Sequence, residues 1–213
     1  MIITWYGHSC FKINTKDVTI ITDPFDKKIG IKPYFGAADI VTVSHEHYDH
    51  NNVESLKGDP FIIRTPGEFE TKNIFIYGFR SFHDNKNGAE RGVNTIYLIE
   101  AEDMRVCHLG DLGEKLSDKV IEKLGQVDIL MIPVGGIYTL DGKEADELID
   151  RIEPSIILPM HYKTPAVNIK IEPLDKFLAA RGIKKQETAD HLTIKKKDLS
   201  QEENKVIILE AAH

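Results

Sequence analysis

Short β-strand patterns fill the first half of the chain, and this limits the folds that it can form. The segments are rich in β-branched or aromatic residues and are separated by glycine, proline, asparagine or aspartate, which is typical of strands joined by turns. The predicted strands are Ile2–Tyr6, Cys10–Ile13, Val18–Thr22, Ile40–Val43, Phe61–Arg64, Ile74–Phe82, Val93–Glu100 and Met104–Leu109.

Helical patterns begin only after these strands. Apolar residues share one helical face in Leu116–Leu124, in Ala145–Ile152 and in Pro173–Leu178. Further strands are predicted between and after these helices, at Val127–Pro133, Ser155–Pro159, His191–Ile194 and Val206–Leu209. No linker-like stretch divides the chain, so we expect residues 1–213 to form one α/β domain of two sheets with covering helices.

A dense group of histidines follows the predicted strand Ile40–Val43. The motif "HEHYDH" contains His45, His47, Asp49 and His50. In an extended backbone His45 and His47 point the same way and can converge on one ion, while Asp49 and His50, past the bend, can reach a second. Imidazole nitrogens with a carboxylate are ligands that zinc, iron or manganese accept. The motif therefore predicts a metal site.

One loop supplies too few ligands, so others must come from elsewhere in the chain. The candidates are His83 in "SFHD", His108 and Asp111 in "CHLGD", and His161 in "LPMHY". Each lies at or just beyond the end of a predicted strand, where ligand sites gather in layered α/β proteins. Each histidine taken alone could equally be a buried, hydrogen-bonded residue, and composition does not choose between His83 and His108.

The ordered set "HEHYDH", "SFHD", "HLGD" and "PMHY" resembles the metallo-β-lactamase superfamily. The opening "WYGHSCFKI" and the later "ITDPF" are similar to its branch of small metal-dependent hydrolases that includes ascorbate-6-phosphate-lactonase-like proteins. The resemblance extends over about residues 1 to 165. It implies a four-layer αββα sandwich with a two-metal site at one edge of the sheets.

The resemblance also implies which residues bind each ion. The first metal is expected to be held by His45, His47 and His83, and the second by Asp49, His50 and His161, with Asp111 bridging the two. His108 has no ligand role in that pattern and is expected to support the site. We expect two divalent ions, with zinc favoured over manganese or iron.

Several other residues stand close to these motifs. Asp23 could accept a hydrogen bond from a ligating histidine or simply form an Asp-Pro turn, and the resemblance favours the first role. His8 could line the pocket or be a structural histidine. Arg91, Tyr138 and Lys163 follow the metal motifs and could contact an anionic substrate, although arginine and lysine are also ordinary surface residues.

These residues predict metal-dependent hydrolysis of an ester, lactone, thioester or phosphoester. Two cations sharing a water lower its pKa, so that a bridging hydroxide held over Asp111 becomes the nucleophile, with Asp49 as the other catalytic carboxylate. The alternatives are an iron-dependent oxidoreductase, a nuclease and a non-catalytic metal-binding protein. Di-iron relatives usually replace the motif's second histidine with glutamate, so His47 counts against the first alternative.

Charge and composition restrict the partners. The net charge of -7 and a pI near 5.7 argue against a nucleic-acid partner and leave a small molecule, anionic or neutral, as the expected one. No apolar run is long enough to cross a bilayer, and the first residues alternate as a strand does and lack the features of a signal peptide. Cys10 and Cys107 belong to no paired-cysteine motif. We therefore expect a cytoplasmic protein.

Overall fold

Two large β-sheets form the centre of the computed structural model, which describes residues 1–184, 188–199 and 204–212. The first sheet contains, in spatial order, β13 (Leu192–Thr193), β1 (Ile2–Gly7), β2 (Cys10–Asn14), β3 (Thr19–Thr22), β4 (Ile40–Thr42) and β5 (Phe61–Ile63). The second contains β14 (Lys205–Val206), β11 (Ile156–Met160), β10 (Ile129–Pro133), β9 (Met104–His108), β8 (Val93–Ala101), β7 (Ile74–Phe82) and β6 (Gly67–Thr71). The short strands β12 (Thr188–Ala189) and β15 (Ile208–Leu209) pair separately.

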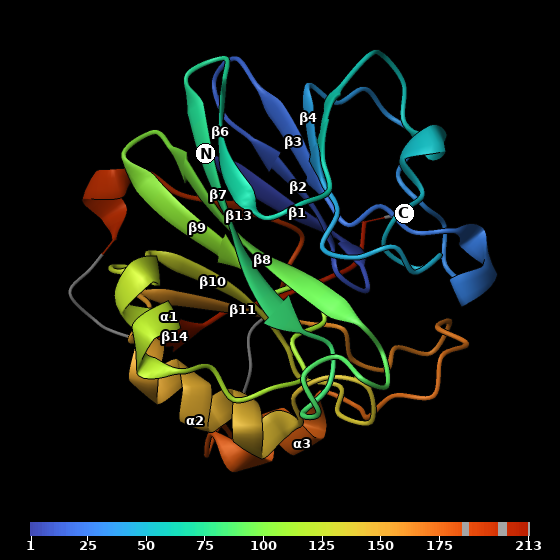
Figure 1. The fold of residues 1–213 in the computed structure, drawn as a ribbon, viewed down its shortest axis with the longest axis vertical. Coiled ribbons are helices and arrows are strands. Elements are labelled where there is room, and N and C mark those ends of the chain that lie inside the picture. Colours follow the sequence, from blue (N-terminus) through green and yellow to red (C-terminus); the bar gives the residue numbers. More distant parts are fainter. Residues whose placement is uncertain (185–187, 200–203, 213) are drawn as a thin grey trace.

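The α-helices lie together on the side of the second sheet that faces away from the first (Figure 1). They are α1 (Asp118–Leu124), α2 (Gly142–Ile152) and α3 (Asp175–Ala180). The outer face of the first sheet is covered differently, by loops and by the 3₁₀ helices η1 (Lys27–Ile29) and η2 (Val53–Ser55), and a third such helix, η3 (Lys196–Asp198), follows β13. Phe25, Ile29 and Val167 pack on that outer face as a small second core.

The main core lies between the two sheets and beneath the α-helices. Strands β10 and β11 are parallel and buried along their whole length, which explains why their sequences are continuous apolar runs. Tyr97 of β8 crosses the interface, since its hydroxyl lies 3.0 Å from the backbone oxygen of Val43, just after β4, and 3.3 Å from that of Ile63 in β5. This buried bond fixes the two sheets next to the segment that carries the histidine motif.

Most predicted strands are present within one or two residues of their predicted ends, and two differences have clear causes. Strand β6 was not predicted because it lies at an edge and is largely exposed, so that its sequence "GEFET" has no apolar face. The predicted strand Val206–Leu209 is divided, because Lys205–Val206 pairs with β11 whereas Ile208–Leu209 pairs with β12.

The topology brings the ends of several strands to one edge of the molecule. Strand β8 is antiparallel to both β7 and β9, so β7 and β9 run the same way, and β10 and β11 run parallel to β9. The carboxyl ends of β7, β9, β10 and β11 therefore meet at a common edge, which is where layered α/β proteins place ligand sites.

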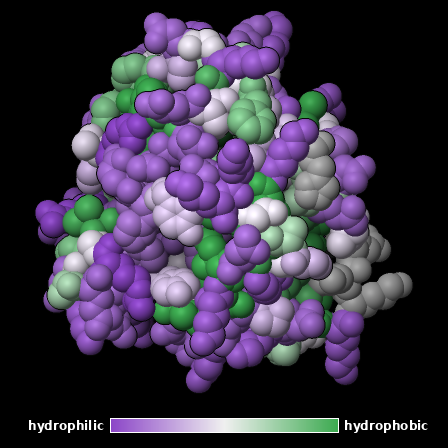
Figure 2. Space-filling view, turned by 90° about the vertical axis from the view of Figure 1, so that its right-hand side faces the viewer, coloured by the Kyte–Doolittle hydropathy of each residue, from purple (hydrophilic) through white to green (hydrophobic). Residues whose placement is uncertain are grey.

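The surface offers no broad apolar area on the face drawn in Figure 2, where hydrophobic residues form small, separate patches among hydrophilic ones. Cys10 and Cys107 are both buried and unbonded to each other. Within the described ranges, no helix has the length and apolar character that crossing a membrane requires.

Candidate metal centre

One carboxylate oxygen lies at the middle of the histidine cluster. The Oδ2 atom of Asp111 is 3.1 Å from Nε2 of His161, 3.2 Å from Nε2 of both His50 and His83, and 4.0 Å from Nε2 of His45. All five side chains are buried. They come from the loop after β4, the end of β7, the turn after β9 and the end of β11. The shared edge of the strands thus becomes a single site.

The structure brings together the residues predicted for each ion. Among the described residues, donor atoms within 4.8 Å of one another form three groups, namely His45 with His47 and His83, Asp49 with His50, His161 and His8, and His45 with His50 and Asp111. The first group is the predicted first ligand set, and the second group contains the predicted second set. His47 is exposed, so the first group reaches the surface.

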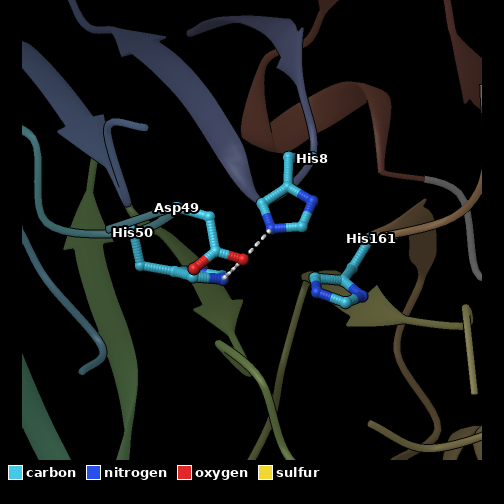
Figure 3. A group of neighbouring side chains, drawn as sticks. All are labelled: His8, Asp49, His50 and His161. Atoms are coloured by element: carbon cyan, nitrogen blue, oxygen red, sulfur yellow. Dashed lines mark hydrogen bonds and ion pairs between the residues drawn. The ribbon is translucent and has the colours of Figure 1, made fainter. Parts of the chain in front are cut away.

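His8 joins the second group, although the sequence left its role open. Its Nε2 atom lies 3.1 Å from Oδ2 of Asp49, and Nε2 of His50 is 3.7 Å from the same oxygen (Figure 3). His161 faces them from the opposite side. His8 stands in the turn between β1 and β2 with a φ of 52°, a backbone conformation unusual for a histidine. The turn thereby directs the imidazole into the cluster.

Burial favours the neutral form of His8, His45 and His47. It lowers the pKa of His45 well below 6.5, and it lowers the pKa of His8 to about 4. His50 differs, because although its burial opposes the charged form, the carboxylates of Asp111 and Asp23 raise its pKa well above 6.5. A neutral imidazole retains the lone pair with which a histidine binds a metal ion.

Asp23 lies in the position that a ligating histidine requires of a supporting carboxylate. Its Oδ2 atom is 2.8 Å from Nδ1 of His50 and 2.5 Å from the hydroxyl of Ser44, and its Oδ1 atom accepts the Ser44 backbone N–H. The Ser44 hydroxyl is in turn 3.0 Å from Nδ1 of His45. One buried carboxylate therefore orients two imidazoles whose Nε2 atoms face Asp111.

Tyr138 and Lys163 have roles in the structure that the sequence did not indicate. The backbone oxygen of Tyr138 is 3.1 Å from Nδ1 of His83 and so directs Nε2 of that ring towards Asp111. The ammonium group of Lys163 donates to the backbone oxygens of Val167 and Ile169, which closes the loop after His161. In this arrangement Lys163 braces its own loop.

Asn94 and Gly110 hold the turn that presents Asp111; Gly110 belongs to the motif "CHLGD", whereas Asn94 lies in none of the motifs. Oδ1 of Asn94 accepts the Asp111 backbone N–H at 2.9 Å, while its Nδ2 atom donates to the Leu109 carbonyl. Gly110 has a φ of 57°, and a Cβ atom there would lie 2.3 Å from Oδ1 of Asn94. A lone asparagine in a strand carries no periodic signal, so local patterns do not reveal the role of Asn94.

A pocket of about 530 Å³ opens beside the exposed end of the cluster. His45 and His47 form part of its wall, and Arg91, which the sequence left as either a substrate contact or an ordinary surface residue, forms another part. This volume lies within the usual range of small-molecule sites.

Comparison with known proteins identifies the family. Residues 2–161 match the family model described as "Beta-lactamase superfamily domain". The chain belongs to the metallo-β-lactamase superfamily. The matched segment agrees with the extent of the motifs, which run from the first strand to His161.

Metallo-β-lactamase relatives resemble the chain over most of its length. A UPF0173 protein of Pyrococcus abyssi is 32% identical over 185 residues, covering 77% of this chain and 84% of the relative. A UPF0173 metal-dependent hydrolase of Salinibacter ruber is 27% identical over 193 residues, covering 77% of this chain and 85% of that protein. The crystal structure of a putative zinc-dependent hydrolase of the superfamily from Thermotoga maritima is 36% identical, with a TM-score of 0.80 over 98% of this chain and 97% of that one.

These matches confirm the predicted fold and the predicted reaction type at a coarse level. The sheet arrangement is that of the superfamily, and the chain is a metal-dependent hydrolase whose histidine and aspartate cluster is able to bind metal.

Proposed function

We propose that the protein hydrolyses an ester, lactone, thioester or phosphoester of a small molecule with two divalent metal ions held around Asp111. The observation that carries the proposal is the ring of four Nε2 atoms around Oδ2 of that residue. Within the described residues, the buried Nε2 of His45 and Oδ1 of Asp111 make no hydrogen bond. Buried polar atoms in native proteins are nearly always paired, so these two atoms fit ligands of an ion.

The donor set fits two ions on chemical grounds. His45, His47 and His83 would hold one, and Asp49, His50 and His161 the other, with His8 close to the second and Asp111 between them. Imidazoles with few carboxylates favour zinc, with manganese and iron as alternatives. Asp111 is anionic as this arrangement requires, because despite its burial the neighbouring His161 and His50 hold its pKa well below 3.8.

Bound divalent ions would supply a water of lowered pKa and would polarise the substrate oxygen. The protein's own contribution is orientation. Asp23 and the backbone oxygen of Tyr138 fix the rings of His50 and His83, and the hydrogen bond between His8 and Asp49 fixes that carboxylate. Such outer contacts keep the donors in place when substrate enters from the adjoining pocket.

Elemental analysis of the purified protein tests the metal part of the proposal. We expect close to two equivalents of zinc or manganese, and we expect Asp111→Ala to reduce this content because both ions lose a shared ligand. Protein that contains no metal and takes up none on addition would contradict the proposal. Iron with a visible absorption band would instead support the oxidoreductase alternative.

A substrate screen tests the reaction. The metal-loaded protein should hydrolyse at least one class in a panel of lactones, thioesters, carboxylic esters and phosphodiesters, and chelation should abolish the activity. The Asp111→Ala variant serves as the inactive control. Metal-loaded protein that hydrolyses no member of any class would count against the proposed reaction.

A further inference from the structure

Three arginines line the pocket that opens beside His45 and His47. They are Arg64 from the end of β5, Arg80 from β7 and Arg91 from the loop between β7 and β8. The segments that bring them together are far apart in the sequence. An accumulation of guanidinium groups in one small pocket is unexpected in a protein with a net charge of -7.

The charges of these arginines are not equally compensated. Nη1 of Arg64 is 2.8 and 2.9 Å from the two carboxylate oxygens of Glu46, which neutralises that side chain. Among the residues that the structure describes, the one carboxylate near Arg91 is that of Glu90, at a long 3.9 Å, and the other oxygen of Glu90 is paired with Lys86 at 2.6 Å.

Arg80 is the least compensated of the three. Throughout the part of the chain that the structure describes, no carboxylate lies within 4.0 Å of its guanidinium nitrogens. Among the described residues, Arg80 has no carboxylate partner and Arg91 has only the long contact with Glu90, so the pocket keeps positive charge that is at most weakly offset.

Aromatic rings orient both Arg80 and Arg91. The guanidinium carbon of Arg80 lies 5.5 Å from the ring centre of Phe82, and that of Arg91 lies 5.4 Å from the ring centre of Tyr138. A guanidinium stacked on a ring keeps its N–H groups directed outward, where they can bind a planar or tetrahedral anion. Such pre-orientation reduces the entropy that is lost on binding.

The backbone of Arg91 is also held in place. Asp84 accepts the backbone N–H of Arg91 at 2.8 Å and those of Lys86, Gly88 and Glu90 at 2.8 to 3.0 Å. This carboxylate follows His83 directly in the chain. The loop that carries the arginine is thus tied to the residue next to a candidate metal ligand.

Strand geometry places Arg80 on the inner face of the second sheet. It is paired with Thr95 and lies on the same face as Ile76 and Tyr97, which are buried between the sheets. Gly78 lies between Ile76 and Arg80 on this face of β7, and a Cβ atom there would be 2.9 Å from Cα of Pro66. The glycine lets the segment after β5 lie close to the strand, and Arg64, Thr65 and Pro66 of that segment line the pocket.

We propose that Arg80 and Arg91 bind an anionic group of the substrate, a carboxylate or a phosphate, at a distance from the bond that is hydrolysed. The inference rests on the proposed function, because it takes the cluster around Asp111 as the place where that bond is broken. The substrate is then an ester, lactone, thioester or phosphoester that carries a second, separate anionic group. A neutral substrate would bring no anion to these two guanidinium groups.

A binding measurement tests the arginines without any catalysis. Inorganic phosphate and succinate are titrated separately into the metal-free protein by calorimetry, and the stronger of the two identifies the preferred anion. Arg80→Met and Arg91→Met should each weaken binding on the order of 10-fold, as expected for loss of a charge-assisted hydrogen bond. Arg151→Met removes a half-buried arginine of α2 that is paired with Asp118 and does not line this pocket, and it should have no effect. Binding that is equal in wild type, Arg80→Met and Arg91→Met would overturn the inference.

Lysine variants separate lost contacts from lost folding. Arg80→Lys and Arg91→Lys keep the charge, so they should bind the anion more strongly than the methionine variants while having similar melting temperatures. If the lysine and methionine variants bind equally weakly and all melt well below wild type, the arginines are structural and the inference is wrong.

A kinetic comparison then connects the pocket to the substrate. The metal-loaded protein is assayed with pairs of substrates. One member of each pair carries a carboxylate or phosphate remote from the bond to be hydrolysed, and the other carries an amide in the same position. The ratio of kcat/KM, anionic over neutral, should exceed 1 in wild type and fall on the order of 10-fold in Arg80→Met. A ratio near 1 in wild type would overturn the inference even if hydrolysis occurs. Failure of every substrate to react would count against the proposed hydrolysis, and the calorimetric result would still decide whether the arginines bind anions.

Discussion

The Nε2 atom of His108 lies 2.9 Å from the backbone oxygen of Ser9. On the other side of the ring, Nδ1 is 3.2 Å from the backbone N–H of Gly110, which can only donate, so Nδ1 accepts and Nε2 carries the hydrogen. Both ring nitrogens are therefore used within the protein. His108 joins β9 to the turn between β1 and β2, and no lone pair remains for an ion.

His83 and His108 should consequently respond differently to replacement. We expect His83→Ala to lose one metal equivalent and nearly all hydrolysis, because Nε2 of His83 faces Asp111 at 3.2 Å. His108→Ala should keep both ions and lose activity about 10- to 100-fold, as is usual when a supporting residue is removed. Elemental analysis of the two variants measures this. A His108→Ala protein with an empty metal position beside a fully loaded His83→Ala protein would reverse the assignment.

Asp23 should control the affinity of the second ion. Removing the carboxylate that holds Nδ1 of His50 should weaken metal binding about 10- to 100-fold in Asp23→Asn, measured by competition with a chelator of known affinity. Asp39→Asn is a suitable control, since that partly exposed carboxylate lies at the opposite end of β4 and contacts Lys72. Equal affinities in Asp23→Asn and wild type would show that the ring of His50 is fixed by other contacts.

The metal-free protein should become less stable as the solution is acidified below pH 6.5. Burial lowers the pKa of His8 to about 4, so between pH 6.5 and 4 the unfolded chain binds a proton that the folded chain does not. A depressed histidine pKa makes folding less favourable as the pH falls through this window. Between pH 6.5 and 4.5 the titration of His8 should lower the free energy of unfolding by about 2 kcal/mol.

Urea unfolding of the wild type and of His8→Gln, both with chelator, isolates this effect. The wild type should lose about 2 kcal/mol more stability than the variant between pH 6.5 and 4.5, because glutamine does not titrate. The raised pKa of His50 acts in the opposite direction, but that residue is present in both proteins. Parallel pH profiles would mean that His8 does not titrate as its burial indicates.

Gly110 should tolerate no side chain. In Gly110→Ala the new Cβ atom would lie 2.3 Å from Oδ1 of Asn94 and 2.6 Å from Cβ of Ser44, in a backbone with a φ of 57°. We expect a loss of about 2 kcal/mol or more in unfolding free energy, together with reduced metal content as Asp111 is displaced. Gly182→Ala provides the comparison, because Gly182 also has a positive φ but no atom within 4 Å of the added Cβ. If the two variants are equally stable and equally loaded, the close packing around Gly110 has no part in holding the site.

The sequence by itself determined the features that depend on neighbouring residues. Alternating and continuous apolar runs located most of the strands, and the apolar faces of Leu116–Leu124 and Ala145–Ile152 located two helices, because burial of one face imposes a period on the chain. The motif from His45 to His50 indicated a metal site for the same reason, since its members are close in space wherever that loop lies. An exposed edge strand such as β6 has no buried face and so left no pattern.

Only the tertiary structure decided the relationships between distant segments. It placed Nε2 of His83 against Asp111 while both nitrogens of His108 were used elsewhere, and it brought His8 from the first turn to Asp49. It also collected the three arginines of the pocket from separate segments. These distances follow from how the two sheets pack and in what order their strands pair, and local periodicity contains no information about either.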